Sequence, residues 1–156
     1  VSSYKDVVFD SMKVNAFRFL VKPFEKEDLY EALDSVIKNL AKTAYIVVKD
    51  TVNQKNITIP ENEIIYAQAD NIYAEVVTAQ GIFLYSNKIS LLVKKLNEEY
   101  FYRSNRSYIV NFNYIIGYSK KEIEFSNGQK ALISSSKFKD FKSKYLNYLK
   151  RKSIGE

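Results

Sequence analysis

The hydrophobic period of this sequence changes near residue 43, and this change constrains the fold more than any other feature. Before it, apolar residues at helical spacing follow a nearly continuous apolar run from Ala16 to Val21, which is typical of a strand buried on both faces. After it, apolar and polar residues alternate with a period of two, as they do in strands. The pattern predicts a partial α/β unit over residues 1–42 and a mostly β domain over residues 43–156.

The first 42 residues predict the order helix, strand, helix. A short helix is expected over residues 5–14, and the strand Ala16–Val21 ends at Lys22-Pro23. Acidic residues then favour a helix start through the macrodipole, and apolar residues continue at helical spacing to Leu40.

The second part predicts a series of antiparallel strands with one internal and one C-terminal helix. The expected strands span residues 45–48, 56–59, 64–67, 72–78, 82–85, 108–110, 115–118, 123–125 and 130–133. A helix is expected around residues 89–96, with Ser86 or Asn87 as its cap, and Asn127-Gly128 favours a hairpin. The run Ser134–Ser136 supplies cap candidates for the last helix. The expected apolar stripe of that helix is Phe138, Phe141, Tyr145 and Leu149.

The net charge of +6 is concentrated near the C-terminus. Residues 137–152 carry seven basic side chains against Asp140 alone. Localised positive charge suits a face that binds a polyanion. The alternative is a solvated, lysine-rich helix that aids solubility.

The sequence contains neither cysteine nor histidine. These absences exclude disulfides, thiolate or histidine metal sites, and nucleophiles activated by histidine. We therefore expect no enzyme and no cofactor. The lack of cysteine fits a reducing cytoplasm, and no apolar run has the length that crossing a bilayer requires, so we expect no membrane partner.

The segment Phe101–Ile116 carries unusual polar residues in a stretch that alternates like a strand. Arg103, Asn105 and Arg106 stand directly before the apolar run Tyr108–Val110. Two cations and an amide are poor core material, but they are well suited to contacting phosphates and base edges.

Residues 44–150 resemble the LytTR-type DNA-binding domain of bacterial response regulators. The resemblance rests on Glu63–Ala67, Ile72-Tyr73 with Gly81, the stretch FYRSNRSYIVNFNYI, Asn127-Gly128, and the serine run before a basic helix. Its most specific element is Arg106–Asn111. The resemblance implies a mostly β fold and sequence-specific binding of double-stranded DNA in the control of transcription.

The resemblance also implies which residues touch DNA. By position, Tyr73, Arg106, and Ser136 or Lys137 would read bases, Arg103 and Lys139 would contact phosphates, and Asn71 is a neighbouring candidate. Asn105 is a further candidate that departs from the family, which more often has histidine there. Tyr73 could instead be one more packed tyrosine, and Arg106 could form a surface salt bridge. Asn111 is expected to order a turn, and Tyr108, Ile109 and Val110 are expected in the core.

The first 24 residues resemble the C-terminal part of a response-regulator receiver domain, without a gap. Ser2 falls at the family's switch hydroxyl, Phe19 at its aromatic switch residue, and Lys22-Pro23 at its Lys-Pro pair. A fixed ammonium and a hydroxyl are what a phosphoryl anion requires. The family's acceptor aspartate and Mg²⁺ cluster lie in its N-terminal half, so we expect no phosphotransfer and no Mg²⁺ site here. A cognate histidine kinase would act only on the full-length protein.

Two other functions stay open from the residues alone. A severed receiver fragment would expose apolar residues, and such surfaces drive association, so a homodimer through this fragment is one expectation. Exposed tyrosines can stack on RNA bases, although no RNP-type aromatic and basic motif is present.

Overall fold

The computed structural model of this chain describes residues 44–154 together with Tyr30 and Leu33. The chain divides after Thr43 into two units. Tyr30 and Leu33, which belong to the first unit, are helical and have exposed side chains. The expected helix over residues 5–14, the strand over 16–21, and the predicted switch residues Ser2, Phe19, Lys22 and Pro23 lie outside the described residues.

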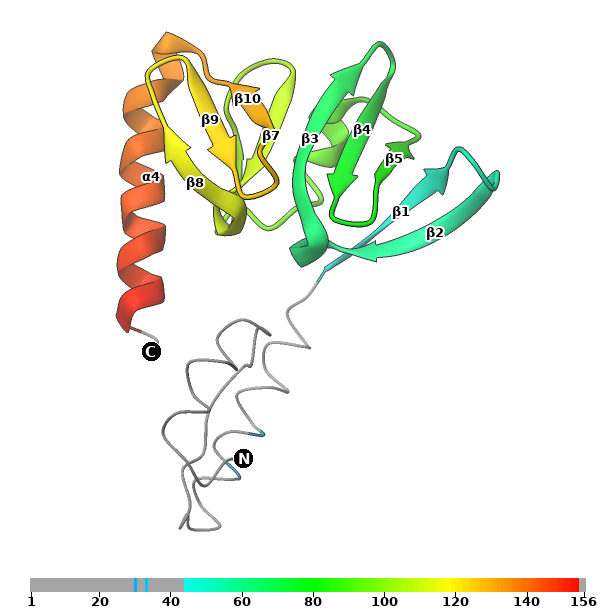
Figure 1. Cartoon of the computed structure of the whole chain (residues 1–156), viewed down its shortest axis with the longest axis horizontal. Helices are drawn as coiled ribbons and strands as arrows, with labels where there is room; N and C mark the ends of the chain where they lie inside the picture. The colour runs from blue at the N-terminus through cyan, green and yellow to red at the C-terminus, as the bar shows by residue number, and fades with distance from the viewer. Residues whose placement is uncertain (1–29, 31–32, 34–43, 155–156) are drawn as a thin grey trace. The chain divides into compact units, whose positions relative to one another are not determined.

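The second unit consists of two antiparallel sheets and a long helix, α4 (Ser135–Ile154) (Figure 1). The larger sheet has seven strands in the order β2-β1-β5-β4-β3-β7-β6, and the smaller sheet has three in the order β10-β9-β8. The strands of the larger sheet are β1 (Tyr45–Asp50), β2 (Lys55–Pro60), β3 (Ile64–Asp70), β4 (Tyr73–Thr78), β5 (Ile82–Tyr85), β6 (Phe101–Arg103) and β7 (Tyr108–Asn111). Those of the smaller sheet are β8 (Ile115–Tyr118), β9 (Glu122–Phe125) and β10 (Lys130–Leu132).

Three short helical turns connect the strands. They are the 3-10 turns η2 (Glu61–Glu63) and η3 (Phe112–Tyr114) and the helix α3 (Ile89–Leu92). Asn111 shapes η3 as the sequence predicted, because its Oδ1 accepts the N–H of Asn113 at 3.0 Å while its Nδ2 donates to the carbonyl of Ile64. The prediction of a mostly β fold with a C-terminal helix is confirmed.

The structure adds one strand to those expected and corrects one helix. The stretch Phe101–Arg103, within the segment that alternates like a strand, forms a separate strand, β6, which pairs with β7 because residues 104–107 reverse the chain between them. The helix α3 spans a single turn, and Lys88 rather than Ser86 or Asn87 stands at its N-cap without a capping side chain. Burial of Ile89 and Leu92 therefore holds this turn in place of a cap.

The neighbouring strands β3 and β7 of the larger sheet are covered on both faces. Along β3, Ile65 and Tyr66 pack into one apolar cluster, whereas Ile64 and Ala67 pack into the other. Along β7, Ile109 and Val110 divide between the same two clusters, while Tyr108 is only partly buried. Strands buried on both faces read as continuous apolar runs, which explains why these segments of the sequence lack clean alternation.

The first cluster joins the two sheets to α4 through aromatic contacts. The rings of Tyr66 and Phe125 stack with centroids 5.0 Å apart. From α4, Phe141, Tyr145 and Tyr148 are buried against it. The predicted stripe is thus wrong at Leu149, which is 37% exposed, because Tyr148 takes the inward position at 5% exposure. Phe138 is partly buried at the margin of the cluster.

No helix in the described part of the chain combines the length and apolar character of a membrane-spanning segment.

Candidate functional site

Three connections between elements lie along one edge of the domain, the upper side in Figure 1. They are the β3–β4 turn at Asn71-Ile72, the β6–β7 loop Ser104–Ser107, and the passage from β10 into α4. The first two are neighbours because β3 pairs with β7, and the N–H of Ala69 donates to the carbonyl of Ser107 at 2.8 Å. We call this edge the loop edge.

Hydrogen bonds made by a buried serine join the β6–β7 loop to the segment that leads into α4. The hydroxyl of Ser104, which is fully buried, donates to the carbonyl of Leu132 at 2.7 Å. The N–H of Ser134 donates in turn to the carbonyl of Ser104 at 3.0 Å. Because a buried hydroxyl or carbonyl without a partner is destabilising, these bonds hold the loop and the helix start in one arrangement.

Asn105 organises the β6–β7 loop from within. Its Oδ1 accepts the N–H groups of Ser107 at 2.7 Å and Tyr108 at 2.9 Å, and its Nδ2 donates to the carbonyl of Leu132 at 3.1 Å. An amide oxygen that accepts from its own loop two and three residues ahead is a common way to stabilise a turn. Most of the hydrogen-bonding capacity of Asn105 is therefore used inside the domain.

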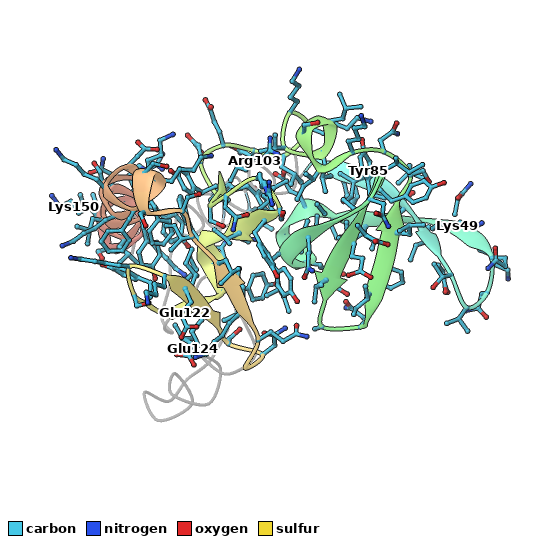
Figure 2. All side chains as sticks on the ribbon, turned by 90° about the horizontal axis from the view of Figure 1, so that it is seen from above. Lys49, Tyr85, Arg103, Glu122, Glu124 and Lys150 are labelled. Carbon is cyan, nitrogen blue, oxygen red and sulfur yellow. The ribbon has the colours of Figure 1, made fainter. Side chains whose placement is uncertain are left out.

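Arg103 closes the same loop from the other side. Its Nε donates to the carbonyl of Asn105 at 3.2 Å, and its Nη2 donates to the carbonyl of Arg106 at 2.8 Å. Figure 2 looks down on the loop edge and shows Arg103, at the end of the edge strand β6, between α4 and the green strands of the same larger sheet. The guanidinium thus fixes the backbone that carries Arg106.

Arg106 projects from this loop into solvent. Its side chain is exposed and has no hydrogen-bond or ion-pair partner among residues 44–154. The surface salt bridge considered as its alternative role is thus not formed with any described residue. Its backbone carbonyl is held by Arg103, so the point from which the side chain leaves is fixed.

The β3–β4 turn carries Asn71 and Tyr73. Asn71 has a φ of 52°, a left-handed conformation that asparagine adopts more readily than most residues, and its Nδ2 lies 3.2 Å from Oδ1 of Asp70. Tyr73 opens β4 with 39% of its side chain exposed, so it is not packed as a core tyrosine would be.

Ser136 and Lys139 lie in the first turns of α4 with exposed side chains. Neither side chain has a hydrogen-bond or ion-pair partner within the described range 44–154. The helix N-terminus points toward the loop edge (Figure 1), and the free N–H groups of a helix start favour anions there.

Lys137 is directed inward, unlike Lys139. Its Nζ donates to the carbonyl of Arg103 at 2.7 Å and lies 5.7 Å from the centre of the Tyr102 ring. Burial lowers the pKa of Lys137; the charges of Arg103 and Lys144 act in the same direction, and Asp140 opposes them. The ammonium of Lys137 therefore ties α4 to β6.

Tyr102 lies beneath this lysine. Its hydroxyl donates to Oδ2 of Asp140 at 2.9 Å, and Lys144 lies over its ring at 5.5 Å. Burial raises the pKa of Tyr102, and the hydrogen bond to Asp140 raises it further. The phenol therefore stays neutral and acts as a fixed link between β6 and α4.

Most residues of the loop edge were candidates from the sequence, but Ser104 and Ile72 were not. Ser104 fastens the loop, and Ile72 stands 59% exposed at the β3–β4 turn. Ser104 carries no pattern that distinguishes it from other serines. Ile72 was detectable, because isoleucine is an unusual residue for a two-residue turn.

Most of the second unit, including the loop edge, matches a known protein family. The sequence pattern of the LytTr DNA-binding domain matches residues 54–146 of this chain. That range contains the β3–β4 turn, the β6–β7 loop and the first part of α4.

Curated relatives are bacterial regulators of low sequence identity. The chain is 24% identical over 123 residues to the sensory transduction protein LytT of Bacillus subtilis, a match that covers 73% of this chain and 51% of that protein. It is 26% identical over 127 residues to the transcriptional regulatory protein YpdB of Escherichia coli K12, covering 74% and 52%. The transcriptional regulatory protein LytR of Staphylococcus aureus is 24% identical over 166 residues, covering 91% and 65%.

A solved structure shares the fold. The chain superposes on a LytTr DNA-binding domain from Bacillus cereus with a TM-score of 0.57 and 21% sequence identity, covering 66% of this chain and 96% of that one. The chain spans about half the length of the first curated relatives that it matches.

Proposed function

This chain belongs to the LytTr DNA-binding domain family, and from that premise we propose that it binds double-stranded DNA sequence-specifically through the loop edge. The observation that carries the proposal is the exposed Arg106, whose side chain has no partner among residues 44–154, on a loop that hydrogen bonds hold beside the start of a basic helix. A loop held in this way can present one guanidinium to a groove from a fixed point.

Arg106 is the base reader in this proposal. A guanidinium can donate two parallel hydrogen bonds to O6 and N7 of guanine in the major groove. Because Arg103 and Asn105 already hold the loop backbone, Arg106 loses little main-chain freedom on binding. Tyr73 and Asn71 approach the DNA from the neighbouring turn, and Ser136 from the helix start.

Phosphate contacts come from the charged groups around this reader. Lys139 is exposed and has no ion-pair partner among residues 44–154, and the N-terminal end of α4 lies at the same edge (Figure 1). Arg103 retains an Nη1 that bonds no described residue, so it can hold the loop and still meet a phosphate. Such contacts position the domain and carry no base information.

The larger protein would be a two-component response regulator that controls transcription. Relatives named LytT in Enterococcus faecalis and LytR in Staphylococcus aureus align with 92% and 91% of this chain, so these alignments extend into residues 1–42. This extension supports the assignment of that region to a receiver domain. A histidine kinase and a second copy of the regulator are the partners this assignment implies.

The experiment that tests the proposal selects bound duplexes from a random pool and then titrates salt. We expect a consensus sequence, and we expect log affinity to fall linearly with log salt by about 0.9 per neutralised phosphate. Arg106→Ala should relax the preference at one base position and weaken binding by about 1–3 kcal/mol.

Arg151→Ala is the matched control. It removes the same charge from the far end of α4, about 24 Å along the helix from Ser135, where Arg151 pairs with Glu99 at 3.3 Å. This control should keep the full base preference. Binding without sequence preference or salt dependence would contradict the proposal, as would single-stranded RNA that competes better than duplex DNA.

A further inference from the structure

The β3–β4 turn exposes an isoleucine on the loop edge. Asp70 and Tyr73 pair across the two strands, so Asn71 and Ile72 alone form the connection. Ile72 as a whole residue is 59% exposed. It therefore presents a branched apolar surface at the tip of a hairpin.

Folding of the turn does not account for this residue. Two-residue hairpin turns favour glycine, asparagine and aspartate, which tolerate positive φ or bond their own backbone. Asn71 meets that need with its φ of 52°. The branched side chain of Ile72 contributes little to the core, because the residue is mostly exposed.

The position of Ile72 would bring it close to a bound DNA duplex. The hydrogen bond from Ala69 to Ser107 holds this hairpin beside the loop that carries Arg106, and Tyr73 next to it is also exposed. A duplex that meets Arg106 and the start of α4 would run past the hairpin tip. Polar readers occupy the neighbouring positions, whereas Ile72 can offer only an apolar contact.

We propose that Ile72 determines specificity by contacting the C5 methyl group of a thymine in the major groove. This inference rests on the proposed DNA-binding function. The thymine methyl is the apolar group that distinguishes one base pair from the others in that groove. An apolar side chain at a fixed hairpin tip recognises it by excluding water from both surfaces.

Deoxyuridine tests the contact directly, because it pairs like thymine and lacks only the methyl group. The binding partner is a duplex selected from a random pool. Each of its thymines is replaced in turn by deoxyuridine, and the affinity of the chain for each modified duplex is measured. At one position we expect about a fourfold loss of affinity, the value of one buried methyl. In Ile72→Ala the same replacement should have no effect. In Ile72→Val the loss should remain, since valine keeps the branched Cβ with both γ carbons and lacks only the δ1 methyl group.

Ile82→Ala provides the matched control. Ile82 is 54% exposed and pairs with Val77 at the other end of β4, about 13 Å along the strand from Tyr73. This variant should keep the full deoxyuridine effect. The urea midpoint of Ile72→Ala should stay close to that of the parent chain, because the side chain is mostly exposed.

The outcomes separate this inference from the function on which it rests. If Ile72→Ala weakens thymine and deoxyuridine duplexes equally, or if no thymine position responds, methyl recognition is overturned while sequence-specific binding stands. If no duplex is bound with salt dependence, the proposed function fails and the inference fails with it.

Discussion

Lys137 and Lys139 stand two residues apart on α4, yet their ammonium groups have different surroundings. Lys137 donates to the carbonyl of Arg103 and lies over the ring of Tyr102, whereas Lys139 is exposed. In a sequence both are simply basic residues at a helix start. The side on which each leaves the helix decides which of them can reach a phosphate.

This difference predicts that only one of the two lysines contributes to the salt dependence of binding. Lys139→Ala should reduce the slope of log affinity against log salt by about 0.9, because one phosphate contact is lost. Lys137→Met keeps most of the aliphatic side chain and removes the bond to Arg103, so it should leave the slope unchanged. Fluorescence anisotropy at several salt concentrations measures both slopes. A reduced slope for Lys137→Met would contradict its inward role.

The polar residues of the β6–β7 loop illustrate the limits of residue-level reasoning. Their types alone indicated that Arg103, Asn105 and Arg106 do not belong in a core. Which of them stabilises the loop and which stays exposed depends on loop geometry. Asn105 accepts hydrogen bonds from Ser107 and Tyr108, whereas the side chain of Arg106 forms no hydrogen bond with any described residue. Their roles in DNA contact stay predictions.

At the scale of elements, α4 shows how tertiary packing selects one face of a helix. Tyr148 lies against Phe112 with ring centroids 5.5 Å apart, and its hydroxyl donates to Oδ1 of Asn113 at 2.6 Å. Leu149 is adjacent in sequence but remains 37% exposed. Both residues fit an apolar stripe at helical spacing, so hydrophobic periodicity alone did not separate them.

The stability of two single variants distinguishes these positions. Tyr148→Ala should lower the free energy of unfolding by about 3–5 kcal/mol, because it leaves a cavity among aromatic rings and removes the bond to Asn113. Leu149→Ala should lower it by less, about 1 kcal/mol, since Leu149 is already 37% exposed in the folded domain. Urea denaturation followed by circular dichroism compares them. Equal losses would refute the packing described for α4.

Tyrosine burial is a property of the whole domain, and it makes the fold sensitive to alkali. Burial raises the pKa of Tyr66, Tyr102, Tyr114, Tyr145 and Tyr148 above the ordinary value of 10.0. In the unfolded chain these phenols would ionise near that ordinary value. Above it, the folded state therefore binds more protons than the unfolded state.

Stability should consequently fall as the pH rises above about 10. Each tyrosine that ionises only in the unfolded chain contributes a slope of up to about 1.4 kcal/mol per pH unit. Urea midpoints measured between about pH 8 and about pH 11 test this expectation, and Tyr102→Phe should have a shallower decline. A midpoint that is constant across this range would contradict it.

The sequence by itself determined the mostly β class of residues 44–154, the place of most strands, and the C-terminal helix. These features follow from local chemistry, namely the period-two alternation, the Asn127-Gly128 turn and the serine run before Phe138. The resemblance of its motifs also indicated the family to which the chain belongs.

Only the tertiary structure decided how the loops meet and which side chains remain free. The pairing of β3 with β7 and the bonds of Ser104 to Leu132 and Ser134 join segments more than 25 residues apart. Such contacts depend on geometry across the whole domain, because each backbone polar group must find its partner once the core has packed. They leave Arg106 and Ile72 exposed on one edge and turn Lys137 inward.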